Sequence, residues 1–418
     1  MSKIKSVKGR QVYDSRGFPT VEVEVLLEDG NIGSAIVPSG ASTGTHEAHE
    51  LRDINKKYLN KSVLQAVENI NNVIFPSIKN LSALNQSEID LTMINLDGTS
   101  NKSNLGANAI LGVSIANCKA AAASKKLEVY EYLGKNNNFS LPFPMLNIIN
   151  GGVHANNSLQ IQEFMIRPDG AENFAECMRM SFLVIQNLKK ILIQKKLSTN
   201  VGDEGGFAPS LNSDQEALDY IIQSIELSGF IPGKDFNLCL DVAANEIYDG
   251  SYYSIENNKK TNPKEMVSYY EKITSKYPIK SIEDPIFEDD WDTWKILTQK
   301  IGNNVQVVGD DLFVTNKSRL KKGIDSKSAN AILIKVNQIG SVTETLETID
   351  MAQKNSFNTI ISHRSGDTED TFIADLAVAT NSNQIKTGSL ARSERVAKYN
   401  RLLRIEDSTV NKILMATL

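Results

Sequence analysis

Three carboxylate side chains stand at the ends of short apolar runs in the second half of the chain. They are Asp241, Glu283 and Asp310. Carboxylates that point into one space repel one another, and each raises the pKa of the others unless a cation neutralises them. Oxygen ligands without Cys or His favour a hard ion, and a partly hydrated carboxylate site suits Mg²⁺. The pattern therefore predicts a magnesium site, with an ion pair to a basic side chain as the alternative for any single carboxylate.

Basic residues follow the same pattern. Lys335 lies in the run Ala331–Asn337, which predicts a fully buried strand. An ammonium group removed from water must pair, reach solvent or lose its proton, so burial is expected to lower its pKa. Lys335 is thus either a salt-bridged lysine or a base kept partly neutral. Arg364 offers a planar fork for phosphate or carboxylate beside the Ser365 hydroxyl, and Lys386 adds a second positive charge.

A metal, an anion clamp and a base in one place suit a phosphorylated carboxylic acid. Such a substrate would bind the cation and lose its α-proton to Lys335, and the cation would stabilise the resulting enediolate. Glu204 lies between Gly202 and Gly205–Gly206, where the backbone can approach a substrate closely. It is the expected acid or base on the opposite face of the substrate.

The elements that must position these groups are short strands. From Leu141 onward, apolar strands alternate with amphipathic helices, which is typical of α/β architecture. In a β/α barrel the carboxyl ends of the strands converge on one face, where active sites are built. We therefore expect one shared site for the polar residues that end these strands, which are Asn150, Gln162 with Glu163, Glu204, Asp241, Glu283, Asp310, Lys335, His363 with Arg364, and Lys386.

The N-terminal third has a different pattern. Residues 3–37 predict a small antiparallel sheet, and helical segments follow to about Leu133. The polar stretch 134–140 is the expected boundary between domains 1–134 and 141–418. The loop 38–44 is either a surface connection or a hinged lid. The run His46–Glu50 is a near miss for zinc motifs and is interpreted as the solvated start of a helix.

Composition narrows the function classes. The chain of 418 residues has a formal net charge of 45 − 50 = −5, which provides no basic footprint for direct binding of nucleic acid. The apolar stretch 105–123 is interrupted by polar residues and predicts a buried helix, so we expect no membrane span. Three separated cysteines in apolar segments and the lack of an apolar signal at the N-terminus favour the cytoplasm.

Six runs along the chain resemble the enolase family. They are Ser39–Gly44, Asn150–His154, Gly202–Pro209, Ser281–Pro285, Lys335–Gly340 and Ser362–Gly366. The resemblance covers nearly the whole chain and is similar to bacterial members. It implies a hydro-lyase of glycolysis and gluconeogenesis that reversibly dehydrates 2-phospho-D-glycerate to phosphoenolpyruvate through an enediolate. The implied fold is an N-terminal α+β cap followed by an atypical α/β TIM-like barrel whose first elements depart from simple alternation.

The resemblance also implies roles for individual residues. Lys335 would remove the C2 proton, and Glu204 would protonate the departing C3 hydroxide; the general mechanism of a lysine base with Mg²⁺ is an established feature of this superfamily. The first Mg²⁺ would be held by the three carboxylates named at the outset, and a second, arriving with the substrate phosphate, by Ser42. The implied catalytic set is Glu204, Lys335, His154 and Glu163. The implied substrate-binding set is His154, Gln162, Glu163, Glu283, Asp310, Lys335, Arg364, Ser365 and Lys386.

Some expectations stay open at the level of sequence. Asn156, Gln160, Asn245 and Asp367 depart from the usual family residues, and the first two are expected to alter hydrogen bonding around His154. The family implies a homodimer or a higher ring, and an additional cell-surface or secreted fraction with a scaffold role. The alternatives are a related Mg²⁺-dependent enzyme acting on a non-phosphorylated acid, and a silent binding protein. Neither explains why the anion clamp and the complete acid–base set are both present.

Overall fold

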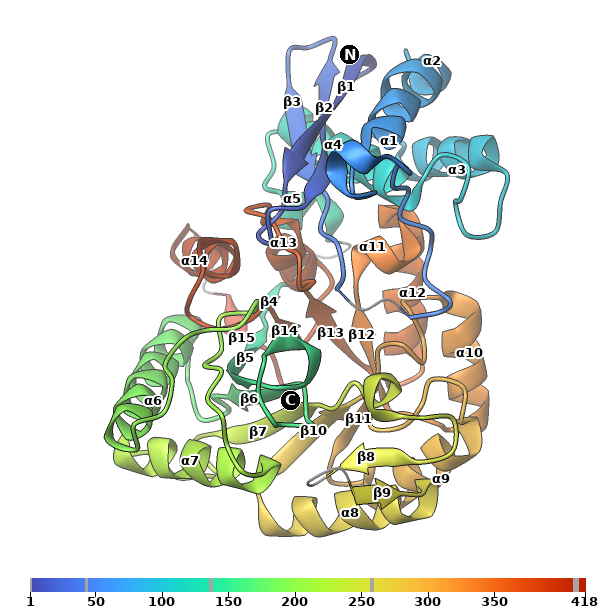
Figure 1. The fold of residues 1–418 in the computed structure, drawn as a ribbon. Helices are drawn as coiled ribbons and strands as arrows, with labels where there is room; N and C mark the ends of the chain where they lie inside the picture. Colours follow the sequence, from blue (N-terminus) through green and yellow to red (C-terminus); the bar gives the residue numbers. More distant parts are fainter. Residues whose placement is uncertain (1, 42–43, 135–137, 256–258, 409–412) are drawn as a thin grey trace.

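We describe a computed structural model of the chain, which covers residues 2–41, 44–134, 138–255, 259–408 and 413–418. A small sheet-and-helix unit lies above a barrel ringed by helices (Figure 1). The structure confirms the α/β class, with an N-terminal α+β cap and a closed barrel of eight strands. Within the described ranges, no helix is both long and apolar enough to cross a membrane.

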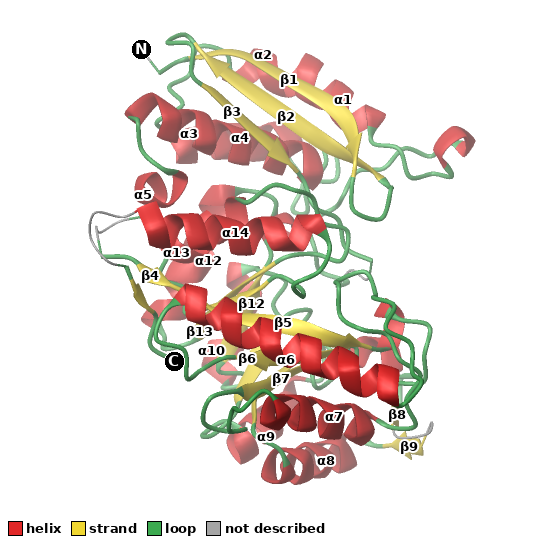
Figure 2. Cartoon of the chain, turned by 90° about the vertical axis from the view of Figure 1, so that its left-hand side faces the viewer, coloured by secondary structure: helices red, strands yellow, loops and turns green. Residues whose placement is uncertain are grey.

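The N-terminal unit is an antiparallel sheet in the order β1–β2–β3, with helices on one side (Figure 2). Its strands are β1 (Ile4–Tyr13), β2 (Pro19–Leu27) and β3 (Ile32–Ile36). Its helices are α1 (Leu64–Asn69), α2 (Phe75–Ile78), α3 (Gln86–Asp97), α4 (Ala107–Lys125) and α5 (Val129–Leu133). The predicted sheet and the predicted buried helix in 105–123 are therefore confirmed.

The packing of α4 on the sheet follows from the side-chain pattern. Val21, Val23 and Val25 alternate along β2 and are fully buried. The helix comes so close to β3 that a Cβ on Gly33 would lie 2.1 Å from the Ala116 carbonyl oxygen. Only glycine fits at that crossing, because any side chain would overlap the helix backbone.

The barrel closes in the order β10–β11–β12–β13–β14–β5–β6–β7. Its strands in chain order are β5 (Phe143–Asn150), β6 (Glu163–Arg167), β7 (Asn237–Asp241), β10 (Ile279–Glu283), β11 (Gln306–Gly309), β12 (Ala331–Ile334), β13 (Asn358–Ser362) and β14 (Gln384–Lys386). The helices of this part are α6 (Phe174–Gln194), α7 (Asp214–Leu227), α8 (Pro263–Lys276), α9 (Trp291–Ile301), α10 (Lys317–Ser326), α11 (Val336–Ile339), α12 (Val342–Lys354), α13 (Phe372–Ala379) and α14 (Ser393–Ser408). Two small pairs lie outside the barrel, β4 (Ser140–Leu141) with β15 (Leu414–Met415), and β8 (Tyr253–Ile255) with β9 (Lys259–Thr261).

One strand runs against the others. β6 is antiparallel to both β5 and β7, whereas every other neighbouring pair in the barrel is parallel. This is the departure from simple alternation that the family resemblance implied. Glu163 begins β6 and pairs with Asp241 at the end of β7. The expectation that Gln162 and Glu163 lie at the carboxyl end of a strand is therefore wrong, because Glu163 is the first residue of β6. Since β6 runs in the reverse direction, its first residue still lies at the common mouth.

Two other expected strands differ from the structure. Residues 201–206 form no strand, and only a single bridge joins Val201 to Phe207, so Glu204 lies on a loop. The strand predicted over residues 331–337 ends at Ile334. Lys335 then caps the short helix α11, which Gly340 terminates in the left-handed conformation with φ 89°. The lysine consequently follows the strand and points to the mouth, where it is partly exposed.

The N-terminal unit contacts the loop that follows β13. Backbone hydrogen bonds join Ser39 and Gly366 in both directions, at 2.7 and 2.9 Å. The run His46–Glu50 contains no helix, so its interpretation as a helix start is wrong. It is an irregular segment that reaches the barrel, where the Thr45 hydroxyl donates to Glu288 at 2.7 Å. The cap thereby covers the mouth to which the polar side chains point.

Candidate active site

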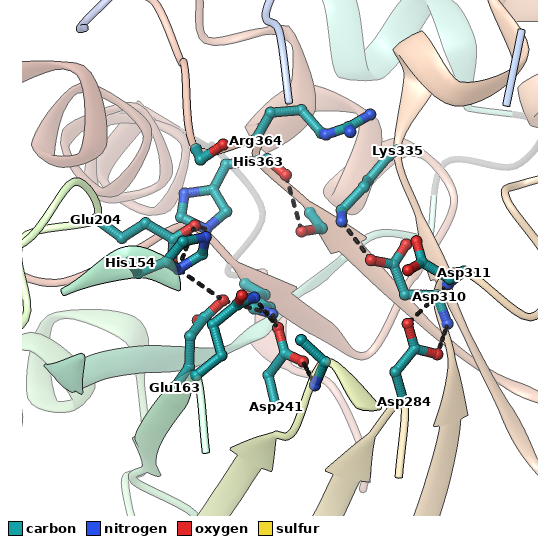
Figure 3. A pocket seen from close by; sticks show the side chains of 15 residues that line it. His154, Glu163, Glu204, Asp241, Asp284, Asp310, Asp311, Lys335, His363 and Arg364 are labelled. Carbon is teal, nitrogen blue, oxygen red and sulfur yellow. Dashed lines mark hydrogen bonds and ion pairs between the residues drawn. The ribbon is translucent and has the colours of Figure 1, made fainter. Parts of the chain in front are cut away.

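The polar side chains meet in one pocket at the mouth of the barrel (Figure 3). Its titratable lining residues are His154, Glu163, Glu204, Asp241, Asp284, Asp310, Asp311, Lys335, His363, Arg364 and Lys386. Lys335 lies on one side of this pocket, and Glu204 lies across it beside two histidines. Of the residues that were expected to share one site, Gln162, Glu163, Glu204, Asp241, Asp310, Lys335, His363, Arg364 and Lys386 line this pocket, whereas Asn150 and Glu283 are not among its described lining residues, although Glu283 pairs with Lys386.

Lys386 is a buried cation in the lining of the pocket. Its Nζ lies 2.9 Å from Asp241, 2.8 Å from Glu283 and 3.0 Å from Glu163. Burial opposes the charge on this ammonium group, but the surrounding carboxylates outweigh burial and raise the pKa of Lys386 well above its usual value. Lys386 is therefore charged and holds together carboxylates that would otherwise repel one another.

Lys335 forms a close ion pair with Asp310, whose other oxygen accepts a hydrogen bond from Gln338 at 2.8 Å. We expected burial to lower the pKa of Lys335. Burial does oppose the charge, but Asp310 outweighs it, so the pKa of Lys335 is raised. The expected lowering of the pKa is therefore wrong, and the salt-bridged alternative for Lys335 is the one present in the structure, because Asp310 is its anionic partner.

The donor set fits a hard divalent cation. Carboxyl groups outnumber cationic side chains in the described lining of the pocket. Burial, followed by the charge on Asp241, raises the pKa of Glu283 well above its usual range, which indicates a shortage of positive charge. The predicted ligands Asp241, Glu283 and Asp310 are all buried at the same mouth. In this structure Lys386 pairs with Asp241 and Glu283, and Lys335 pairs with Asp310. The predicted cation and its alternative, an ion pair with a basic side chain, would therefore use the same carboxylates.

Two further aspartates were not singled out from sequence. Asp284 accepts hydrogen bonds from the backbone N–H groups of Asp310 and Asp311 at 2.9 and 2.8 Å. Carboxylate oxygens of these three residues lie within 4.8 Å of one another. Burial and then the charge on Asp310 raise the pKa of Asp311 to about 8. Asp284 belongs to the run Ser281–Pro285, which carries the family resemblance. Its hydrogen bonds to the backbone that follows β11 are visible only in the folded structure.

Glu204 lies among groups that control its charge. Its Oε1 is 3.7 Å from His154 Nδ1 and 3.5 Å from His363 Nε2, while Oε2 accepts a hydrogen bond from Asn147 at 3.1 Å. Burial disfavours the carboxylate, but the two histidines hold the pKa of Glu204 well below its usual range. The neighbouring Glu163 behaves in the opposite way, since burial and the charge on Glu204 raise its pKa well above normal. The two carboxyls thus divide into one anion and one proton carrier.

Arg364 and Ser365 follow β13 and are buried. The guanidinium group forms a bidentate ion pair with Glu47, with contacts of 2.9 and 3.1 Å, and also donates to Asn337 at 3.1 Å. The Ser365 hydroxyl accepts from the Ala41 N–H at 2.6 Å. Sequence reasoning missed Glu47 because the run His46–Glu50 was interpreted as the solvated start of a helix. The only sequence feature that could have pointed to Glu47 was its acidic side chain within a pattern that resembles a zinc motif.

The four residues that depart from the usual family pattern lie in different surroundings. Asn156 is exposed, and the Gln160 amide donates to the Ser158 carbonyl at 3.4 Å, so neither has a hydrogen bond with His154 in the described structure. Asn245 donates to Asp311 at 2.9 Å and accepts from the Glu288 N–H at 3.0 Å. Asp367 is bonded to the buried Lys398 at 2.8 Å. Ser42, the expected ligand of a second cation, lies outside the described residues.

Comparison with known proteins agrees with the fold and the site. Residues 4–133 match the family model described as enolase, N-terminal domain, and residues 138–417 match the one described as enolase, C-terminal TIM barrel domain. A curated protein named enolase from Pelagibacter ubique (strain HTCC1062) is 58% identical over 417 residues, which cover 100% of this chain and 99% of that protein. The chain belongs to the enolase family of hydro-lyases.

Proposed function

We propose that the protein catalyses the Mg²⁺-dependent, reversible dehydration of 2-phospho-D-glycerate to phosphoenolpyruvate. The observation that carries this proposal is the placement of Lys335 and Glu204 across one pocket, with an anion-binding arginine and buried carboxylates between them (Figure 3). Dehydration needs a base at one carbon and an acid at the next, on opposite sides of the substrate. This arrangement supplies both.

The residues divide the proton transfers as follows. Lys335 takes the C2 proton in its neutral form, and the electron pair of the C–H bond moves toward the substrate carboxylate to give an enediolate. In the second step that electron pair forms the C2–C3 double bond as the C3–O bond breaks. Glu204 is ionised in the free enzyme, so it first takes up the proton that the neighbouring Glu163 carries. It then gives this proton to the leaving hydroxide, so that one water molecule is released. Glu163, with its raised pKa, keeps a proton beside Glu204 in the free enzyme. His154 and Gln162 complete this side of the pocket.

Asp241, Glu283 and Asp310 would hold the first Mg²⁺, and Ser42 is the proposed ligand of a second one. When bound, the cations would supply positive charge for the substrate carboxylate and relieve Lys335 of its anionic partner Asp310. The support for this assignment is the excess of buried carboxyl groups and the raised pKa of Glu283.

Arg364 and Ser365 are the proposed phosphate ligands. Arginine suits this role because its planar fork binds two oxygens of one phosphate. Glu47 occupies the terminal nitrogens of Arg364 in this structure, so a phosphate dianion must share or displace this carboxylate. Lys386 lines the same pocket and is the proposed partner of the substrate carboxylate.

A direct assay tests the function. Purified protein is incubated with 2-phosphoglycerate, and formation of phosphoenolpyruvate is followed with excess EDTA and after Mg²⁺ is restored. We expect no turnover in EDTA and full recovery with Mg²⁺. The same assay with unphosphorylated glycerate serves as the control for the alternative activity. Full turnover in chelator, or preference for glycerate, contradicts the proposal.

Other aspects of the proposal concern the protein as a whole. We propose domains 1–134 and 141–418, because the N-terminal sheet and the barrel share no strand. Cytoplasmic action agrees with three buried, free cysteines, Cys118, Cys177 and Cys239. A homodimer or higher ring and an additional surface or scaffold role rest on the family resemblance. Measurement of the molar mass in solution by light scattering tests the proposed homodimer or higher ring.

A further inference from the structure

Arg395 is a fully buried arginine outside the residues considered so far, on the first turn of α14. Its two terminal nitrogens have four hydrogen-bond acceptors, and Nη1 also lies 3.6 Å from Asp367 Oδ2 in an ion pair. Nη1 donates to the Arg364 carbonyl at 2.5 Å and lies 2.6 Å from His363 Nδ1. Nη2 donates to the Ser365 carbonyl at 2.6 Å and to the Asp203 carbonyl at 3.2 Å. Each terminal N–H group of the guanidinium thus has one acceptor.

These contacts join two loops of the pocket. The Arg364 and Ser365 carbonyls belong to the loop that carries the anion clamp, whereas the Asp203 carbonyl precedes Glu204 on the loop that carries the acid. A guanidinium group is planar and presents its N–H groups in a rigid fork. One side chain therefore fixes the separation between the phosphate end and the acid end of the pocket.

The contact with His363 also determines a tautomer. A guanidinium group can only donate hydrogen bonds, so His363 Nδ1 must be the acceptor and cannot carry a proton. An imidazolium would place an N–H group and a positive charge against Arg395, and burial and Arg395 together disfavour the charged form near neutral pH more than Glu204 and Asp367 favour it. His363 is therefore neutral, with its proton on Nε2.

The proton on Nε2 faces the acid. Nε2 lies 3.5 Å from Glu204 Oε1, too far for a good hydrogen bond, and it has no hydrogen-bond partner in the described structure. Catalytic hydrogen bonds are often long in the free enzyme and shorten when substrate is bound. With the opposite tautomer, an unprotonated Nε2 would face the Glu204 oxygen, and the repulsion between lone pairs would displace the carboxyl group.

We propose that Arg395 is a positioning residue that fixes His363 as its Nε2–H tautomer and thereby orients Glu204. This inference rests on the proposed function insofar as Glu204 is the acid. It does not require Arg395 to touch the substrate. The charge and geometry of Arg395 matter because a single guanidinium meets the histidine and both loops.

The wild-type protein offers the first test. The chain has four histidines, so the side-chain ¹⁵N signals can be assigned by replacing each in turn. We expect His363 Nδ1 to show the shift of an unprotonated nitrogen and Nε2 the shift of a protonated one near neutral pH. A protonated Nδ1 overturns the proposal. This measurement needs no activity, so it stays informative even if the proposed dehydration is absent.

The second test uses a matched pair of substitutions on α14. Arg395→Lys keeps the charge but loses the fork, whereas Arg401→Lys makes the same change at an ion pair with Asp375. Partners that orient a catalytic group typically contribute tenfold to hundredfold to activity. Because the lysine side chain is shorter and has a single terminal nitrogen, we expect Arg395→Lys to lose the contact with His363 Nδ1, so that His363 shows a protonated Nδ1. We expect kcat to fall by about that factor, with KM changed less than about threefold. Arg401→Lys should retain the wild-type tautomer and kcat.

The active fraction must be known to interpret the loss. Binding of a phosphonate analogue of the substrate gives the number of competent sites, and kcat is expressed per site. A loss of sites with unchanged kcat per site and an unchanged tautomer means that Arg395 serves stability alone, which overturns the proposal. If Arg395→Lys does not fold, the tautomer of the wild-type protein alone decides.

Discussion

Replacing Lys386 with methionine should separate its structural role from that of the metal. The Lys386 side chain is 2% exposed and forms ion pairs with Asp241, Glu283 and Glu163. Methionine keeps most of the apolar length but removes the charge. Removing one partner of a buried ion pair typically costs about 3–5 kcal/mol, because a buried charge is left without compensation. We expect a loss of that size in the free energy of unfolding of the metal-free protein near neutral pH.

The same variant should bind Mg²⁺ more tightly. Asp241 and Glu283 are proposed metal ligands, and in the free protein both are held by Lys386. The lysine and the cation therefore compete for the same oxygens. If Lys386→Met recovers even a third of the energy lost above, its affinity for Mg²⁺ rises about tenfold, since about 1.4 kcal/mol corresponds to that factor. Turnover should nevertheless be lost, because the substrate carboxylate lacks its cation.

Calorimetric titration with Mg²⁺ and unfolding by guanidinium, with and without EDTA, provide the measurements. Lys102→Met is the matched control, since Lys102 is 3% exposed and its Nζ lies 3.0 Å from Glu344, away from the pocket. The control should be destabilised equally with and without Mg²⁺, with unchanged affinity for the metal. Lys386→Met should recover much of its stability when Mg²⁺ is added. Equal or weaker binding of Mg²⁺ by Lys386→Met would refute the reasoning.

Three further predictions concern the acid–base pair, pH and packing. Lys335→Ala should lose exchange of the substrate C2 proton with solvent, whereas Glu204→Gln should keep exchange and lose net dehydration; equal loss of exchange in both variants contradicts their division of roles. Burial lowers the pKa of His363 from 6.5 to about 4, so the unfolded chain takes up this proton first as the pH falls. His363 therefore contributes stability that is fully present above about pH 6.5 and is lost toward pH 4. Between about pH 7.5 and about pH 5, the free energy of unfolding of the wild-type protein should fall by about 2 kcal/mol more than that of a His363→Gln variant. Gly33→Ala should lower the free energy of unfolding by at least about 2 kcal/mol through overpacking against α4, and an unchanged denaturation midpoint would argue against that close crossing.

The sequence by itself determined where the reactive groups gather. Asp241, Glu283 and Lys386 end apolar runs whose spacing predicts strands, and strands in a barrel present their ends on one face. Residue type then indicated the chemistry, since carboxylates suit a hard cation and an arginine fork suits phosphate. Helix starts are also local: the side chains of Ser213 and Ser341 accept backbone hydrogen bonds from the residues three positions later in the chain. These features depend on neighbours in the chain, which a sequence displays directly.

Only the tertiary structure decided direction, pairing and charge. Nothing local shows that β6 runs antiparallel, although this places Glu163 beside Asp241. The contact of Glu47 with Arg364 joins residues 317 positions apart, and Arg395 reaches the acid loop from 192 positions away. The protonation of Lys335 reverses the sequence expectation for the same reason. A pKa shift or an ion pair depends on the distance between charged groups in space. The closure of the barrel and the packing of the N-terminal unit against it determine those distances.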